Sequence, residues 1–205
     1  MNKDLVIEQI NINYNVSRET IDKIDRYVEC LLDWQKKFNL IGKSTIENVW
    51  ERHILDSIQL LKFLPKNYTT LMDIGTGAGL PGFILAICEG EEKDIYLVDS
   101  NKKKCSFLEH VARECDVRVS ILPERIENIN IGTAKIDIIT ARAFSSIDNI
   151  FRLTKPYIHG KSKYLLQKGI NAKTELTNSK ISSQLNVKYI SSVTNKEAFI
   201  LDIEL

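Results

Sequence analysis

Along the first third of the chain, hydrophobic residues recur every three or four positions. Over residues 17–40 they fall on one helical face, and Ser17 stands where its hydroxyl can cap the first turn. Over residues 44–63 a similar pattern opens with Ser44 and Glu47, the spacing of a capping box. The pattern therefore predicts two amphipathic helices at the start of the chain.

After residue 67 the pattern changes to short β-type runs that alternate with helix-type runs. The predicted strands are 69–75, 94–100, 117–122, 136–142 and 162–168, and the predicted helices between them are 80–90, 101–115 and 145–158. Strands that are apolar on both faces and alternate with helices are typical of a parallel sheet covered on both sides. The sequence therefore predicts a Rossmann-like α/β architecture.

The last part of the chain breaks this alternation. The runs 187–193 and 198–205 are separated by a short turn with no helix between them, so the two strands must be antiparallel. We predict one compact sheet domain over residues 67–205, closed by this hairpin, with a helical extension over residues 1–66.

The strongest motif is the run LMDIGTGAGLPG at residues 71–82, in which a strand leads directly into four glycines. Glycines let the backbone turn tightly and approach a ligand closely. In an open α/β sheet, ligands bind beyond the carboxyl ends of the strands, where this loop lies. We therefore expect a ligand against Gly75, Gly77 and Gly79.

Two classes of ligand fit this loop. Residues 77–82 match the dinucleotide pattern GxGxxG, and Asp99 follows Gly79 by twenty residues, as a ribose-binding acid would. However, Asp73 just before the glycines and the terminal hairpin favour a methyltransferase, in which the loop holds the methionine end of the cofactor. In either class Asp99 would accept hydrogen bonds from ribose hydroxyls.

Two further segments end strands at the same edge of the predicted sheet. Residues 123–127 follow the third strand and could bracket an adenine ring, although a plain surface loop would have the same sequence. Arg142 ends the fourth strand and is either a buried ion-pair partner or a functional side chain facing the cleft. We favour the functional role, in which Arg142 is the residue closest to the chemistry.

Some motifs are absent, and their absence reduces the number of possible methylation reactions. No Asp/Asn-Pro-Pro-aromatic motif follows the fourth strand, and no cysteine stands beside a proline in a site loop, so methylation of an exocyclic amine and covalent cysteine attack are disfavoured. Guanine N7 remains a candidate, because its lone pair is free and no proton has to be removed.

A possible hydrolase triad is also excluded. His53, Asp56 and Ser57 share one helical face, but three neighbours on one helix cannot form the required line from serine to histidine to aspartate. We interpret them as a structural cluster or a substrate-side contact.

Composition adds little beyond the class of protein. The chain has 205 residues and a net charge of +1, with no apolar leader and no run of about 18 apolar residues, so we expect a cytoplasmic protein. Its four cysteines form no CxxC pair, which favours reduced thiols over disulfides or zinc ligands.

Charge is distributed unevenly along the chain. From residue 155 to residue 196 there are eight lysines against the single acid Glu175. This stretch is either a solvated surface or a footprint for nucleic-acid phosphates. The lysines are Lys155, Lys161, Lys163, Lys168, Lys173, Lys180, Lys188 and Lys196.

Several separated segments resemble the bacterial small-subunit rRNA methyltransferase G family, also called glucose-inhibited division protein B. They lie between Trp34 and Gly169: WQKKFNLIGKSTIENVWERHILDS, DIGTGAGLPG, VDSNKKKCSFL, ERIE, TARAFSSI and QKG. The resemblance implies a class I S-adenosylmethionine-dependent methyltransferase fold with a mainly parallel seven-stranded sheet. It further implies methyl transfer to N7 of a guanine, at position 527 in the 530 loop of 16S rRNA.

The resemblance also assigns site residues. Cofactor contacts fall on Gly75, Leu80, Ile126, Glu127 and Arg142, and positions near the site on Asn39, His53, Asp56 and Ser57. Of these we expect Asn39 and His53 on the substrate side, and we add Lys168 to them. The expected partners are S-adenosyl-L-methionine and 16S rRNA or the small ribosomal subunit, with no metal, no membrane and a monomeric chain. Two alternatives stay open: an NAD(P)-dependent Rossmann oxidoreductase and a non-catalytic rRNA-binding module.

Overall fold

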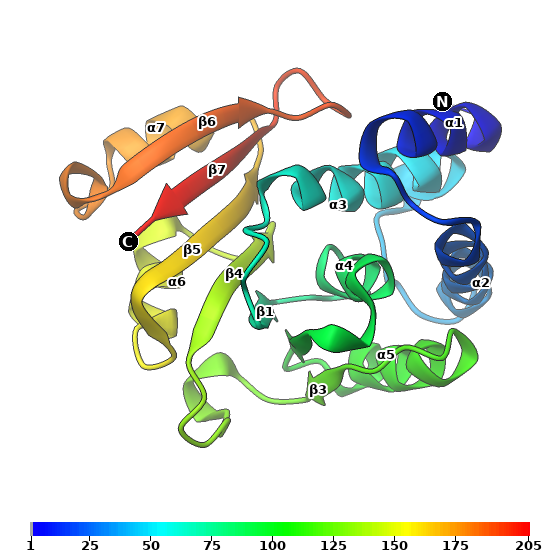
Figure 1. Ribbon diagram of the computed structural model, residues 1–205, viewed down its shortest axis with the longest axis horizontal. Coiled ribbons are helices and arrows are strands. Elements are labelled where there is room, and N and C mark those ends of the chain that lie inside the picture. The colour runs from blue at the N-terminus through cyan, green and yellow to red at the C-terminus, as the bar shows by residue number, and fades with distance from the viewer. Residues whose placement is uncertain (1) are drawn as a thin grey trace.

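The computed structural model describes residues 2–205 and contains one seven-stranded sheet with helices on both faces (Figure 1). The strands are β1 (Thr70–Ile74), β2 (Asp94–Val98), β3 (Ser120–Leu122), β4 (Ile136–Arg142), β5 (Ile158–Lys168), β6 (Asn186–Ser191) and β7 (Phe199–Glu204). Their order is β3-β2-β1-β4-β5-β7-β6, and only the pairings made by β7 are antiparallel. The predicted parallel sheet with a terminal antiparallel hairpin is confirmed.

The helices divide between the two faces of the sheet. The main ones are α1 (Lys3–Tyr14), α2 (Arg18–Gln35), α4 (Gly82–Glu89), α5 (Lys102–Glu114), α6 (Ile147–Thr154) and α7 (Ala172–Thr177). Leu71 of β1 packs in a core shared with α1, α2, α4 and α5, whereas the next residue, Met72, packs in a second core with α6 and α7. This alternation explains why the strands read as apolar on both faces.

The amino-terminal helices belong to the first of these cores. The predicted helix over residues 17–40 is α2, whose cap is confirmed because Ser17 Oγ accepts the Thr20 amide, but it ends at Gln35. On α2, Tyr27 stacks on Phe83 of α4 and donates its hydroxyl to the Ala78 carbonyl of the glycine loop. The helical extension therefore braces the loop, and the domain division at residues 66 and 67 stays a prediction. The helices α1 and α7 were not predicted.

The predicted single helix over residues 44–63 is wrong. The segment consists of a 3-10 turn, η1 (Lys43–Asn48), a π-helical turn, η2 (Trp50–Leu55), a short α3 (Asp56–Ile58) and a second 3-10 turn, η3 (Gln59–Phe63). The capping box does not form, because η1 begins after Gly42 without a side-chain cap. Changes of helical pitch of this kind re-aim side chains and often mark functional sites.

Short 3-10 turns complete the connections: η4 (Gly90–Glu92), η5 (Ile126–Asn128) and η6 (Ser182–Gln184). Within residues 2–205, no helix has the length and apolar character needed to cross a bilayer. The same residues contain no group of three or more His, Cys, Asp or Glu side chains placed to hold a metal ion. All four cysteines have free thiols.

Candidate functional site

Two neighbouring cavities open at the carboxyl ends of the central strands. The first, which we call the glycine-loop cavity, has a volume of about 420 Å³ and lies beyond β1, β2 and β4. The second, the arginine cavity, has a volume of about 370 Å³ and lies between β4, β5, the η2–η3 segment and the β6–β7 turn. Ala143, directly after β4, lines both. Two ligands bound in these cavities would meet at this residue.

The glycine-loop cavity is lined by both polar and apolar residues. Its walls include Gly75 after β1, Asp99 after β2, the Ile126–Glu127 turn and Phe144. Asp99 accepts the Gly77 amide at 2.9 Å and the Asn101 amide at 2.8 Å. A carboxylate accepts about four hydrogen bonds, so Asp99 keeps capacity for two more donors. A nucleoside with a ribose diol and an adenine ring fits this combination of carboxylate and apolar side chains.

The glycines of the loop serve different purposes. Gly75 has φ +65°, and a Cβ atom there would lie 2.2 Å from the Phe144 ring at the cavity wall. At Gly79 a Cβ atom would meet Phe83 at 2.6 Å and Leu108 at 2.8 Å, both of which are buried in the core. Gly75 therefore shapes the cavity, whereas Gly79 allows the loop to pack against α4 and α5.

Asp73 stabilises the glycine loop through buried hydrogen bonds. Its carboxylate is fully buried and accepts the Thr140 hydroxyl at 2.8 Å and the Gly82 amide at 2.9 Å. Burial raises the pKa of Asp73 to about 6, although these hydrogen bonds oppose the shift. The acid that precedes the glycines thus joins β1, β4 and the start of α4, and it does not line the cavity.

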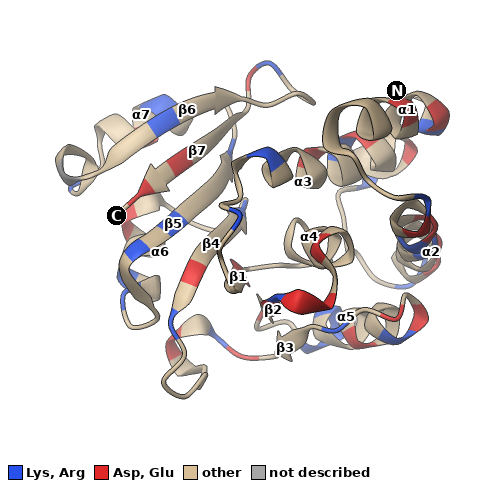
Figure 2. Cartoon of the chain, viewed as in Figure 1, with Lys and Arg blue, Asp and Glu red and all other residues tan. Residues whose placement is uncertain are grey.

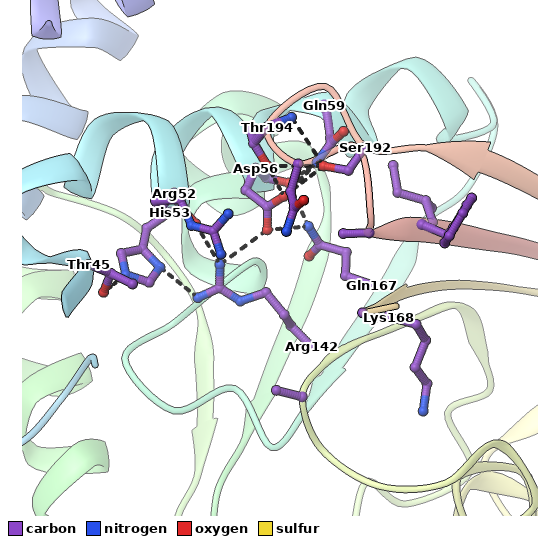
Figure 3. Close-up of a pocket in the computed structure, with 16 residues that line it drawn as sticks. Thr45, Arg52, His53, Asp56, Gln59, Arg142, Gln167, Lys168, Ser192 and Thr194 are labelled. Carbon is purple, nitrogen blue, oxygen red and sulfur yellow. Dashed lines mark hydrogen bonds and ion pairs between the residues drawn. The ribbon is translucent and has the colours of Figure 1, made fainter. Parts of the chain in front are cut away.

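In the arginine cavity, Arg142 lies at the centre of a hydrogen-bond network (Figure 3). Its guanidinium donates to the Arg52 carbonyl at 3.2 Å, to Asp56 Oδ2 at 3.3 Å and to His53 Nδ1 at 3.0 Å. The Arg142 and Asp56 side chains are 20% and 15% exposed, so the ion pair is largely desolvated. Arg142 is thus both an ion-pair partner and a cavity-lining residue, and three of its five N–H groups are used.

The partners of His53 determine its protonation state. Because Arg142 can only donate, His53 Nδ1 must accept, and the ring proton sits on Nε2, which donates to Thr45 Oγ1 at 2.8 Å. Thr45 in turn donates to the Gly42 carbonyl. Burial, assisted by the charges of Arg142 and Arg52, lowers the pKa of His53 to about 3. His53 is therefore a neutral residue that orients Arg142.

Asp56 connects three parts of the chain at one carboxylate. Its Oδ1 accepts from Gln59, Ser192 and Thr194, and its Oδ2 accepts from Arg142 and Gln167. These five donors come from the helical segment, from β4 and β5, and from the β6–β7 turn. Asp56 therefore fixes the walls of the arginine cavity relative to one another.

The state of His53 predicts a pH effect on stability. The folded-state pKa lies below the unfolded value of 6.5, so unfolding takes up a proton below pH 6.5, and acid destabilises the fold. In the parent, His53 should lower the free energy of unfolding by about 2 kcal/mol between pH 8 and pH 5. In His53→Gln we expect this contribution to be absent. Urea unfolding followed by tryptophan fluorescence measures it in both proteins, and the opposite contribution of Asp73 cancels in the difference. Identical pH dependence in parent and variant would contradict the neutral assignment.

The structure brings most of the predicted site residues to the two cavities. Gly75, Asp99, Ile126 and Glu127 line the glycine-loop cavity. Arg142, His53 and Lys168 line the arginine cavity. Ser57 is buried and donates to the His53 carbonyl, so no hydrolase arrangement exists.

The remaining predicted residues do not line either cavity. Leu80 is buried behind the loop, together with Gly79. Gly77 contacts the site only through its amide, which donates to Asp99. Asn39 is exposed in the turn after α2.

Three lysines of the lysine-rich stretch contact other side chains of the protein. Lys163 is paired with Asp202 at 3.0 Å, Lys168 with Glu175 at 2.9 Å, and Lys173 lies over the Phe199 ring. Of the other five lysines, Lys161 lies in β5 and Lys188 in β6, and the remaining three lie in connecting segments: Lys155, Lys180 and Lys196. The blue segments of β5, α7 and β6 in Figure 2 mark lysines of this stretch. Three of the eight lysines therefore have partners within the protein, and the prediction of an RNA footprint stays untested.

The four cavity residues that donate to Asp56 besides Arg142 were missed from the sequence: Gln59, Gln167, Ser192 and Thr194. Gln167 belongs to the QKG segment already singled out, so its position at the end of β5 was a usable signal. Ser192 and Thr194 reach the site only because β6 and β7 form an antiparallel hairpin in which β7 pairs with β5.

Comparisons with known proteins agree in sequence and in fold. The family model of rRNA small subunit methyltransferase G matches residues 20–200. The ribosomal RNA small subunit methyltransferase G of Orientia tsutsugamushi (strain Ikeda) is 37% identical over 200 residues, covering 98% of each chain. The protein of that name from Jannaschia sp. (strain CCS1) is 40% identical, covering 91% of this chain and 89% of its own.

Solved structures of low sequence identity share the fold. A SAM-dependent methyltransferase from Aquifex aeolicus superposes with a TM-score of 0.62 at 16% identity, over 80% of this chain and 98% of its own. The O-methyltransferase TomG from Streptomyces achromogenes, solved in complex with SAM, gives a TM-score of 0.59 at 11% identity, over 98% and 96%. The architecture is that of class I methyltransferases, with an added helical extension.

Proposed function

This chain belongs to the rRNA small subunit methyltransferase G family and uses S-adenosylmethionine, and we propose that it methylates N7 of a guanine in the 530 loop of 16S rRNA. We further propose that the glycine-loop cavity holds the cofactor, with Asp99 accepting from the ribose and Ile126 and Glu127 flanking the adenine. The arginine cavity then takes the acceptor base. Since the substrate is ribosomal RNA, we expect the protein to work in the cytoplasm.

One observation supports N7 as the methylated atom. The two side chains of the arginine cavity that could serve as a general base are both engaged: Asp56 accepts five hydrogen bonds, and both His53 ring nitrogens are paired. A nucleophile in this cavity must therefore react without losing a proton. Guanine N7 does so, because its lone pair is free, whereas an exocyclic amine has to lose a proton to a base.

The residues then act by positioning. When bound, S-adenosylmethionine supplies an electrophilic methyl group on a sulfonium. Asp99 and the glycine loop would hold the cofactor in the glycine-loop cavity, while Arg142, held by His53 and Asp56, would orient the base in the arginine cavity. Proximity and alignment of this kind can account for several orders of magnitude in rate.

The test is a transfer assay with isotopically labelled S-adenosylmethionine and small ribosomal subunits from cells that lack this gene. We expect the label in 7-methylguanosine from the 530 loop after nuclease digestion. Label in another nucleoside or another loop would refute the proposed position while leaving the rRNA methyltransferase assignment intact.

A further inference from the structure

Gln167, at the carboxyl end of β5, carries a buried acceptor without a partner. The residue is 7% exposed and lines the arginine cavity. Its Nε2 donates to the Asp56 carbonyl at 2.6 Å and to Asp56 Oδ2 at 2.8 Å, which determines the orientation of the carboxamide. Its Oε1 has no hydrogen-bond partner. Buried polar atoms are normally paired, and an unpaired one calls for an explanation.

The obvious competing acceptor in this cavity is already used. A carboxylate is the side chain best suited to accept two N–H groups from one edge of a base. Asp56 is the carboxylate here, but its two oxygens already accept from five protein donors. Among the described residues that line this cavity, Gln167 alone has a buried side-chain acceptor without a hydrogen-bond partner.

A donor stands directly beside this acceptor. Arg142 and Gln167 are register partners on the parallel strands β4 and β5, and both donate to Asp56 Oδ2, as the dashed lines of Figure 3 show. Three of the five Arg142 N–H groups are used within the protein, which leaves two for a ligand. The wall of the cavity thus presents a donor and an acceptor side by side.

We propose that Gln167 determines the specificity for guanine, by accepting from N1–H while Arg142 donates to O6. The inference rests on the proposed function. On guanine, O6 has N1 on one side and N7 on the other, and in the protein Arg142 has Gln167 beside it across the sheet and Ala143 after it along the chain. A guanine placed in this order directs N7 toward Ala143, which lines both cavities. Adenine would place its amine against Arg142 and its N1 acceptor against Gln167.

The experiment compares two target RNAs, one with guanosine and one with 2-aminopurine at the methylated position. The second base keeps N7 and the exocyclic amine but lacks O6 and N1–H. The measured quantity is the ratio of kcat/KM for the two RNAs, in the parent and in Gln167→Met. We expect the parent ratio to fall by about tenfold or more in this variant, because a site that hydrogen-bonds its substrate discriminates through those bonds.

Gln59→Met is the matched control. Gln59 lines the same cavity and also donates to Asp56, but its Oε1 is already paired with the Val193 amide. Its substitution disturbs the same network without removing a free acceptor, so we expect the ratio to stay within about threefold of the parent while the overall rate falls.

The outcomes separate this inference from the proposed function. An unchanged ratio in Gln167→Met, or an equal loss in Gln59→Met, overturns the role of Gln167 alone. A parent protein that methylates no guanosine at N7 overturns the proposed function, and the role of Gln167 with it. Stabilisation of each variant by S-adenosylhomocysteine verifies that the variants are folded.

Discussion

Gly75→Val should abolish binding of the cofactor while leaving the protein folded. Gly75 has φ +65°, a conformation in which a β-branched residue is strongly disfavoured, and it lines the glycine-loop cavity. A new side chain would also displace the Phe144 ring from the cavity wall. In the parent, S-adenosylhomocysteine at a hundredfold excess over its Kd should stabilise the fold by about 2.7 kcal/mol, or roughly 5–10 °C in Tm. In the variant we expect no shift.

Gly132→Val is the control for backbone strain. Gly132 has φ +63°, nearly the same value, but nothing lies within 4 Å of its Cβ position, and it does not line the cavity. Both variants should therefore lose similar intrinsic stability, and only Gly132→Val should keep the ligand-induced shift. If Gly75→Val bound S-adenosylhomocysteine with the parent affinity, the assignment of the glycine-loop cavity to the cofactor would be incorrect.

Arg142→Lys should reduce methyl transfer by about a hundredfold or more, the usual effect of losing one preorganised donor at a reaction centre. Lysine keeps the charge, but a single ammonium cannot reproduce the planar fork that reaches Asp56, His53 and the Arg52 carbonyl together. Because Arg142 lines the arginine cavity and not the glycine-loop cavity, we expect cofactor affinity to change by less than about threefold. Single-turnover transfer rates and titration with S-adenosylhomocysteine measure the two effects separately.

Arg118→Lys is the matched control for this substitution. Arg118 makes an exposed ion pair with Asp94 and lines neither cavity, so the same change there should leave both measurements unaltered. A parallel loss of cofactor affinity and transfer rate in Arg142→Lys would instead place Arg142 on the cofactor, as the family resemblance implies.

The sheet could be predicted in detail because its signals are local. Leu71 and Met72 face opposite cores, so both had to be apolar, and the same holds along β4. The loop after Ile74 contains glycines where the backbone adopts positive φ or packs closely on a helix. The short turn before Phe199 allowed only an antiparallel hairpin. Each of these inferences depended only on a few neighbouring residues and on the known period of side chains along a strand or helix.

The segment over residues 43–63 could not be predicted in the same way. Its periodicity favoured one regular helix, and Ser44 with Glu47 matched a capping box. The observed 3-10 and π turns place His53, Asp56 and Gln59 so that they meet residues of β4, β5 and the β6–β7 turn. Tertiary hydrogen bonds outweighed local helix propensity, which amounts to less than about 1 kcal/mol per residue.

By itself the sequence determined the class of fold, the glycine loop with Asp99, and the family to which the chain belongs, because these depend on periodicity and on motifs of adjacent residues. Only the tertiary structure decided that Arg142 and the Gly75 loop face two different cavities, that His53 is neutral, and that Gln167 retains a free acceptor. These properties depend on partners far apart in the chain: Asp56 and Gln167 are 111 residues apart. Burial and hydrogen-bond pairing are fixed by packing, which no local pattern of residues records.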